Sequence, residues 1–252
     1  MEDKFWNLID EAKELPYGQT KVALLEEAVR IADAHLSPRY SFYARKDLTE
    51  AAIFSGKAEK AIVAFAWCLD YSDKNPQEFE TFYNSYQLMW HYKWIAHQLS
   101  AFPEISLKTI EDTIEDFRKR CEKFNFNLRI YYKLKYYLAS HLGNEDEEDY
   151  YIAQWLNTER DMLADCLACD KNSHVYYLIK RDKFNEAYQL AEPIFNGQLS
   201  CHSVPHSTYA DFLIPLIQEG RYKEAETFHQ KGYQLIHNQV DFLEEISSHI
   251  EY

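Results

Sequence analysis

Several thiol and imidazole side chains lie in the C-terminal third of the sequence, where they could bind a metal ion. The six potential soft ligands are Cys166, Cys169, His174, Cys201, His202 and His206. The first two form a Cys-x2-Cys pair, and thiols three residues apart share one face of a helix, as two zinc ligands would. However, no second Cys-x2-Cys pair exists, and thiols in helices more often fill apolar contacts between helices. The pattern therefore predicts no metal site and no cofactor.

The sequence also lacks the motifs that mark common catalytic sites. It contains no Gly-x-Ser-x-Gly, no Gly-x-x-x-x-Gly-Lys-Ser/Thr, no Gly-x-Gly-x-x-Gly and no His-Glu-x-x-His. The ten histidines are scattered, without a companion nucleophile at a telling spacing. The acidic run 144–149 lacks the alternating ligands and central glycine of a calcium loop, and it predicts the start of a helix instead. We therefore expect that the protein is not an enzyme.

The charge of the chain limits its partners. The net charge is −14, from 41 acidic and 27 basic residues, so the chain as a whole repels phosphate backbones and we expect no nucleic acid partner. The N-terminus lacks the basic and apolar zones of a signal peptide. The longest apolar run, residues 61–69, is too short to span a bilayer, so we expect no membrane association. Five cysteines, an odd number, suit reduced thiols, and these features together predict a cytoplasmic protein.

Apolar residues recur at helical spacing over almost the whole chain, while glycine and proline number only six and seven. Pro38 and Pro76 stand where helices should begin, and Gly143 and Gly220 stand where helices should end. The expected helical segments are 2–14, 20–36, 39–55, 58–71, 76–100, 106–124, 127–142, 145–159, 161–180, 184–196, 206–219, 222–237 and 239–252. Pro215 falls inside one of them, which predicts a kink or a later helix start. No Ser/Gly-rich linker divides the chain, so the sequence predicts one all-α domain, residues 1–252.

A six-residue phrase recurs between the expected helices. The copies are GKAEKA at 56–61, DKFNEA at 182–187 and GRYKEA at 220–225, with a weaker copy, GNEDEE, at 143–148. The last two strong copies begin 38 residues apart, and self-similarity at such a period indicates stacked helix pairs. A small residue such as Ala61, Ala187 or Ala225 lets paired helices approach closely.

The phrase and its surroundings resemble the tetratricopeptide repeat. The matching positions are Leu48, Ala52, Gly56, Ala61, Phe65 and Cys68 in one unit, Leu178, Phe184, Ala187, Ala191 and Ile194 in a second, and Phe212, Leu216, Gly220, Tyr222, Ala225 and Phe228 in a third. The units around 76–124 and 143 are degenerate, and the period exceeds the roughly 34 residues usual for the family. The resemblance implies a right-handed superhelical solenoid of antiparallel helix pairs, with about 12–13 helices.

In the tetratricopeptide family, the first helix of each pair lines the concave face where ligands bind. The register of the resemblance implies a ligand-binding groove formed by Tyr43, Lys46, Tyr86, Trp90, Lys93, His97, Lys133, Tyr137, His141, Asn172 and Tyr176. This mixture of aromatic and basic residues suits an extended peptide with acidic groups or a C-terminal carboxylate. The alternative is that half of the aromatic residues face the core. Glu50 stands where chaperone-binding members carry asparagine, which argues against a chaperone C-terminus as the ligand.

The function implied by the resemblance is a protein- or peptide-binding scaffold or regulatory adaptor. Two alternatives remain open. One is self-association, including a homodimer through the terminal segment 239–252, whose apolar residues are Val240, Phe242, Leu243, Ile246 and Ile250. The other is a sensor domain of a larger bacterial regulatory protein, of which this chain would be the N-terminal part.

Overall fold

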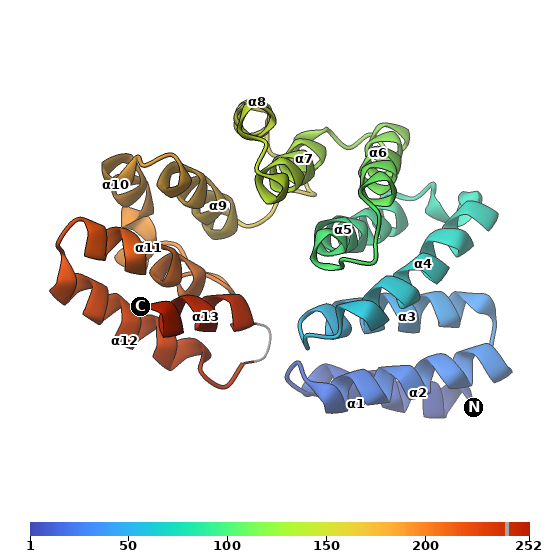
Figure 1. Cartoon of the computed structure of the whole chain (residues 1–252). Helices are drawn as coiled ribbons and strands as arrows, with labels where there is room; N and C mark the ends of the chain where they lie inside the picture. Colours follow the sequence, from blue (N-terminus) through green and yellow to red (C-terminus); the bar gives the residue numbers. More distant parts are fainter. Residues whose placement is uncertain (240–241) are drawn as a thin grey trace. The chain divides into compact units, whose positions relative to one another are not determined.

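The computed structural model describes residues 1–239 and 242–252, and all regular structure in these residues is helical (Figure 1). Thirteen α-helices and two 3-10 helices follow one another along the described chain. Their bounds are α1 Glu2–Glu14, α2 Gln19–His35, α3 Pro38–Ile53, α4 Ala58–Lys74, η1 Pro76–Phe79, α5 Phe82–Gln98, η2 Leu99–Ala101, α6 Leu107–Lys123, α7 Arg129–Leu142, α8 Glu145–Asn157, α9 Leu167–Lys180, α10 Phe184–Phe195, α11 His206–Gln218, α12 Tyr222–Ile236 and α13 Leu243–Glu251. The predicted all-α class is confirmed. None of the described helices combines the length and hydropathy that crossing a membrane requires.

Most predicted helices agree closely with observed ones, and the main exception lies between residues 76 and 100. This segment is not one helix, because η1 ends at Phe79 and α5 begins only at Phe82. Thr81 caps α5, and its hydroxyl oxygen accepts the backbone N–H of Asn84 at 3.4 Å.

Two further predictions about helix ends were wrong for local reasons. The segment expected from residue 161 becomes helical only after Cys166, whose sulfur accepts the N–H of Cys169 at 3.3 Å. Pro215 lies inside α11, which begins at His206. Of the two expectations for Pro215, a kink or a later helix start, the later start was therefore wrong. In the terminal segment, α13 begins at Leu243, and Val240 lies outside the described residues.

The turns at the recurring phrase share one backbone geometry. Gly56, Asp182 and Gly220 have positive φ angles of 64°, 54° and 71°. The residue after each donates its N–H to the carbonyl oxygen five residues earlier, at 2.8, 2.9 and 2.8 Å. A left-handed residue followed by this bond is the Schellman motif, which satisfies the last carbonyls of a helix. Gly143, in the weaker copy, has φ 68° and the same bond at 3.0 Å.

One turn of the same type escaped prediction from the sequence. Asn125 has φ 59°, and the N–H of Phe126 donates to the carbonyl oxygen of Cys121 at 2.9 Å. No glycine marks this position, but asparagine adopts the left-handed conformation more readily than other non-glycine residues. The turn geometry found at the recurring six-residue phrase therefore also ends α6, although the repeat pattern in the sequence is degenerate there.

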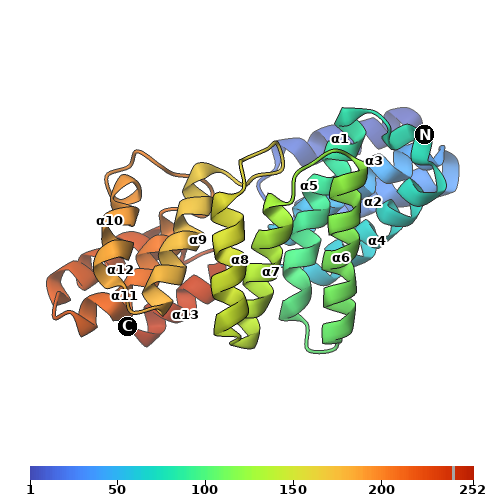
Figure 2. The ribbon, with the colours of Figure 1, turned by 90° about the horizontal axis from the view of Figure 1, so that it is seen from above.

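The described chain divides into two compact units, residues 1–164 and 165–252. In the first unit, each of the helices α1 to α4 packs against the next. A buried apolar cluster that includes Phe5, Ile9 and Leu25 fills the space among α1, α2 and α3. A second cluster, with Met89 and Phe117, lies among α4 to α7, and Figure 2 shows α5 to α8 side by side. The buried core of this unit therefore extends from each helix to the next, in the order of the sequence.

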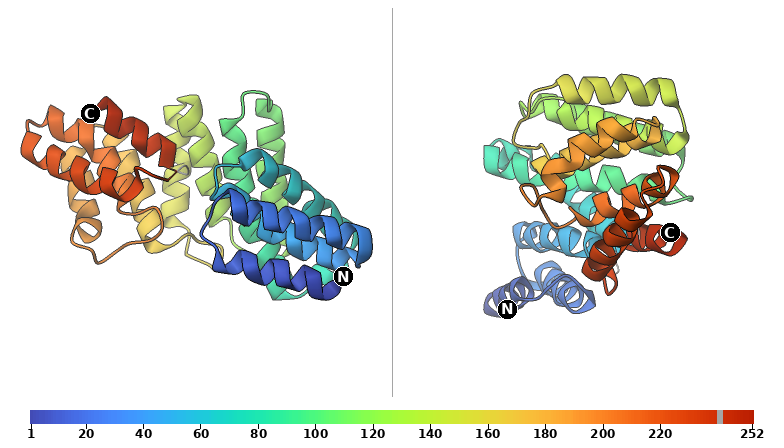
Figure 3. Two further views of the ribbon diagram at one scale, coloured as in Figure 1. Left: turned by 90° about the horizontal axis from the view of Figure 1, so that it is seen from below. Right: turned by 90° about the vertical axis from the view of Figure 1, so that its left-hand side faces the viewer.

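The second unit contains α9 to α13. Helix α9 packs against α10, and α11 packs against both α12 and α13, as Figure 3 shows for the latter three. Phe212 is fully buried at the centre of its apolar cluster, with the Phe195 ring centroid 5.3 Å away. Helix α13 buries His249 but leaves Leu243 and Ile250 exposed, at 67% and 78%.

Candidate peptide-binding groove

A cavity of about 530 Å³ lies among α1, α3, η1 and α5 of the first unit. Its lining residues are Trp6, Ser37, Arg39, Tyr40, Phe42, Tyr43, Lys46, Glu78, Phe79, Tyr83, Asn84 and Gln87. We call this cavity the α1–α3–α5 groove. It contains Tyr43 and Lys46, two of the residues that the resemblance placed on a ligand-binding face.

Aromatic side chains form one wall and the rim of this groove. The Trp6 ring centroid lies 5.3 Å from that of Tyr43 and 5.9 Å from that of Tyr40. The Tyr40 hydroxyl donates a hydrogen bond to the Glu2 carboxylate, which holds its ring in place. In contrast, Tyr83 at the start of α5 is 65% exposed. The groove thus combines a packed aromatic wall with an accessible aromatic side chain, and both offer apolar contact area.

Two cationic side chains line the groove. The Lys46 ammonium lies 3.0 Å from an Asp47 carboxylate oxygen and 3.4 Å from the Gln87 side-chain oxygen. Burial acts to lower the pKa of Lys46, but the Asp47 carboxylate outweighs it, so the pKa is raised and the ammonium stays charged. Arg39 is exposed and forms no ion pair with any residue in the described ranges 1–239 and 242–252. Its guanidinium is therefore available to an acidic group of a ligand.

A smaller hollow of about 260 Å³ shares Tyr43 and Lys46 with the groove. A carboxylate, Glu50, lies in its lining and accepts a hydrogen bond from the Tyr17 hydroxyl at 2.7 Å. The other Glu50 oxygen lies 3.7 Å from Nε2 of His91. The imidazole of His91, followed by the Tyr17 hydroxyl, lowers the pKa of Glu50. The aromatic groove therefore adjoins a polar hollow with an ionised carboxylate.

The predicted residues on α5 and α7 gather in a different place. Nζ of Lys93 donates to the carbonyl oxygen of Leu163 at 2.8 Å and lies 3.3 Å from the Trp90 ring centroid. Nζ of Lys133 lies 4.8 Å from the Trp155 ring centroid. Lys93 and Lys133 are only 3% and 2% exposed, so the structure buries both of these predicted ligand-binding residues. We call this set, with His97 and Tyr137, the α5–α7 cluster.

Contacts between aromatic rings connect the other residues of the α5–α7 cluster and the side chains next to it. The His97 and Tyr137 ring centroids are 4.5 Å apart. Tyr86 is half-buried, stacks on Phe82 and packs against the core cluster of the first unit. Trp90 also packs against that core cluster. The alternative interpretation, in which part of the predicted aromatic set faces the core, therefore holds for Tyr86 and Trp90.

The remaining predicted residues lie elsewhere. His141 is exposed in the last turn of α7. Asn172 and Tyr176 lie on α9 in the second unit, where Tyr176 is 41% exposed. The Asn172 amide donates to the Asp211 carboxylate at 3.3 Å, and burial raises the pKa of Asp211 to about 8. These residues do not take part in the α1–α3–α5 groove.

Several residues that line the groove were not predicted from the sequence, chiefly Trp6, Arg39, Tyr83 and Gln87. Tyr83 lies on the same face of α5 as Tyr86 and Trp90, three and seven residues before them, but the predicted ligand-binding face began only at Tyr86. The spacing of Tyr83 from Tyr86 and Trp90 was the signal that could have added Tyr83 to the predicted set.

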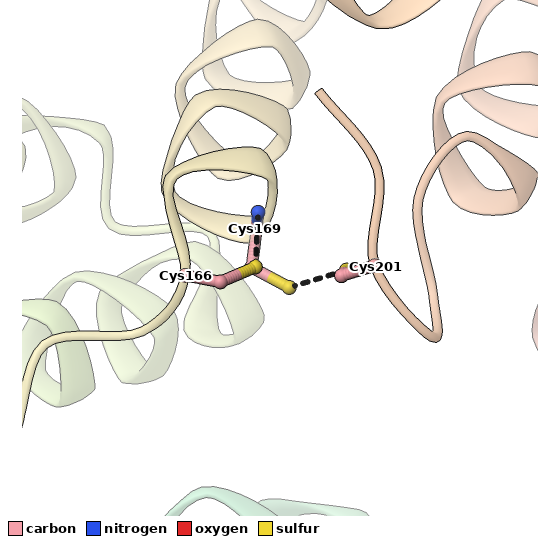
Figure 4. Close-up of side chains that lie close together, drawn as sticks. All are labelled: Cys166, Cys169 and Cys201. Atoms are coloured by element: carbon pink, nitrogen blue, oxygen red, sulfur yellow. Dashed lines mark hydrogen bonds between the residues drawn. The ribbon is translucent and has the colours of Figure 1, made fainter. Parts of the chain in front are cut away.

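Three of the predicted soft ligands meet in the second unit. Figure 4 shows Cys166 and Cys169 at the start of α9 and Cys201 on the segment before α11. The sulfur atoms all lie within 4.8 Å of one another, and those of Cys169 and Cys201 are 3.2 Å apart. Cys166 is exposed, and the other two are half-buried. Cys169 and Cys201 also pack against a small apolar cluster that includes Ala168 of α9 and Ile194 of α10, whereas Cys166 is exposed.

No protein-family model, curated protein or solved structure matches this chain.

Proposed function

We propose that the protein binds an extended segment of a partner protein in the α1–α3–α5 groove, as a scaffold or regulatory adaptor. The segment would contribute an acidic group next to an apolar side chain. The observation that carries this proposal is a cavity of about 530 Å³ in which aromatic rings adjoin two cationic side chains. Recognition of an extended peptide needs such apolar pockets together with polar groups that set its register.

The two kinds of side chain would have different roles. The rings of Trp6, Tyr43 and Tyr83 offer apolar area at a low cost in conformational entropy, because an aromatic side chain has few rotatable bonds. Arg39 would pair with a carboxylate of the segment, since it has no ion-pair partner among the described residues. Lys46 would add a second positive charge, although Asp47 offsets part of its attraction.

The turn geometry supports a repeat architecture for this scaffold. Schellman-type turns end α3, α6, α7, α9 and α11, and within each unit consecutive helices pack against one another. We infer that these pairs belong to a tetratricopeptide-like stack, in which first helices such as α1, α3 and α5 present one face to a ligand. Such a scaffold with reduced thiols would work in the cytoplasm.

A display library of extended peptides can test the proposal directly. Three full-length baits are compared: the wild type, a groove variant with Arg39→Ala and Tyr83→Ala, and a matched control with Lys119→Ala and Tyr150→Ala. All four substituted side chains are exposed, so the fold should tolerate each pair of changes. Related acidic and apolar peptides should be enriched on the wild type and on the control, and lost on the groove variant. Peptides that bind all three baits equally would place the binding site elsewhere.

The alternative function is self-association, in which a second copy of this chain binds the exposed side of α13. Leu243 and Ile250, seven residues apart on α13, are both largely exposed and share one side of the helix. Light scattering at micromolar concentration should then report a dimer, and Leu243→Lys with Ile250→Lys should convert it to a monomer. A monomeric wild type would eliminate this alternative.

A further inference from the structure

We propose that Cys166, Cys169 and Cys201 bind one zinc ion as thiolates, with the fourth coordination position open to solvent. This site lies in the second unit and does not depend on the function proposed for the α1–α3–α5 groove. Two elements supply the ligands, the start of α9 and the segment between α10 and α11. Zinc would therefore link that segment to α9.

The positions of the sulfur atoms suit tetrahedral coordination. Zinc–sulfur bonds of about 2.3 Å place two thiolates of one tetrahedron about 3.8 Å apart. The three sulfur atoms lie within 4.8 Å of one another, and those of Cys169 and Cys201 are 3.2 Å apart. Each separation thus lies within about 1 Å of the separation that zinc requires. Side-chain rotations of this size need no change in the backbone.

Backbone N–H groups already point at two of the sulfur atoms. The N–H of Cys169 donates to Sγ of Cys166 at 3.3 Å. The N–H groups of Ser203 and Val204 form hydrogen bonds with the sulfur of Cys201. Such outer hydrogen bonds orient metal ligands and partly compensate the charge of the thiolates. The two elements therefore hold their sulfur atoms in a geometry suited to thiolate ligands.

The other two cysteines of the chain provide an internal contrast. Cys68 and Cys121 are buried in the apolar core of the first unit, and burial raises the pKa of Cys68 to about 12. These are inert packing residues. In contrast, Cys166 is exposed and Cys169 and Cys201 are half-buried, so an ion can reach them from solvent. The chain thus separates two packing thiols from three that converge.

The three thiolate ligands determine which metal ions the site prefers. Thiolate ligands favour zinc and other soft ions over magnesium or calcium, which prefer oxygen ligands. Each thiol loses its proton to solvent as its bond to zinc forms, so binding releases protons and weakens as the pH falls. Three protein ligands leave one position for water or for a donor atom of another molecule. Zinc is therefore the ion that we expect at this site.

Cobalt substitution tests the site in the full-length, untagged protein. The reduced, metal-free protein is titrated with Co²⁺ and then with Zn²⁺ in oxygen-free buffer. We expect one Co²⁺ per chain, with thiolate-to-cobalt absorption in the near ultraviolet and the visible bands of tetrahedral cobalt. One equivalent of Zn²⁺ should remove both. A wild-type protein that shows no thiolate-to-cobalt absorption would overturn the proposal.

Cys166→Ser is the sharpest variant, because serine is a favoured cap at this helix start and preserves α9 while removing one thiolate. It should weaken Co²⁺ binding by at least about tenfold and reduce the thiolate absorption. The matched controls, Cys68→Ala and Cys121→Ala, should bind Co²⁺ as the wild type does. Equal binding by Cys166→Ser and the wild type would contradict the assignment, provided that circular dichroism shows the same helix content.

Thiol alkylation, followed by peptide mass spectrometry, provides a second readout. Zn²⁺ should slow the alkylation of Cys166, Cys169 and Cys201 by at least about tenfold, since a bound thiolate is no longer a free nucleophile. Equal rates with and without Zn²⁺ would count against the site. Recovery of a disulfide between Cys169 and Cys201 from zinc-treated protein would identify a redox pair instead and overturn the proposal.

Discussion

The α1–α3–α5 groove and the α5–α7 cluster use the same residue types in different surroundings. In the groove, Lys46 lies 5.0 Å from the Tyr43 ring centroid and remains half-buried beside a cavity. In the cluster, Lys93 and Lys133 lie against tryptophan rings and are almost completely buried. Cation–π contact is thus common to both regions, and access to solvent distinguishes them.

The difference shows how burial changes the role of one residue type. A lysine charge removed from water needs fixed polar partners, as the carbonyl oxygen of Leu163 provides for Lys93. Such a lysine contributes to the structure of the protein, and its loss leaves partner groups uncompensated. A lysine at the edge of a cavity keeps part of its hydration and can exchange an internal partner for a ligand. We therefore expect structural effects from the cluster and binding effects from the groove.

The largest effect should follow from Lys133→Ala. We expect the free energy of unfolding to fall by about 3 kcal/mol, because the change removes a buried charge and its packing against Trp155. Urea denaturation followed by circular dichroism measures this loss. Lys119→Ala, at an exposed position, is the control and should change the free energy by less than about 0.5 kcal/mol. A loss below about 1 kcal/mol for Lys133→Ala would remove the contrast between the two regions.

An intermediate effect, on binding, should follow from Lys46→Ala. The dissociation constant of a peptide selected on the wild type should rise about tenfold, which corresponds to about 1.4 kcal/mol. Fluorescence anisotropy of the labelled peptide gives this value. The free energy of unfolding should change by no more than about 1 kcal/mol, because the ion pair with Asp47 is only partly buried. An unchanged dissociation constant would mean that Lys46 is not part of the ligand site.

The smallest effect should come from Glu50→Gln and should depend on pH. The folded state lowers the pKa of Glu50, so its stabilising contribution is present above the usual glutamate pKa of about 4.5 and is lost as the pH falls through the lowered value. The variant should therefore be slightly less stable than the wild type at pH 7, by less than about 1 kcal/mol because the side chain is partly exposed. The difference should disappear at low pH.

Urea midpoints at several pH values test this prediction. Glu104→Gln is a suitable control, because Glu104 is exposed outside the groove and should give the same midpoint as the wild type at every pH. If Glu50→Gln shows the same deficit at pH 7 and below the lowered pKa, the effect would have a packing origin. In that case the ionised carboxylate would not be the feature that stabilises the polar hollow.

Much of the secondary structure could be predicted from the sequence, because helix ends depend on neighbouring residues. Pro38 begins α3 and Gly143 ends α7, as their restricted or permissive backbones require. The break before α5 and the turn at Asn125 were missed. Both are marked by residues, Thr81 and Asn125, whose preferences for such positions are weaker than those of proline and glycine.

The candidate sites could be predicted only in part. Tyr43 and Lys46 were predicted to lie on a ligand-binding face, and both line the α1–α3–α5 groove. The same reasoning placed Lys93 and Lys133 on that face, but both are buried, since residue type and spacing do not reveal how deeply a long side chain is covered. The three converging thiols were named among six potential soft ligands, but no metal site was predicted, because the position of Cys201 depends on how its loop returns to α9.

The sequence by itself determined that this protein is helical and where most helices end, since these properties depend on residues within a few positions of one another. Only the tertiary structure decided which lysines face a cavity and which are buried. It alone decided that a sulfur atom at residue 201 meets two near residue 166. The physical reason is that burial and convergence depend on packing between segments far apart in the chain.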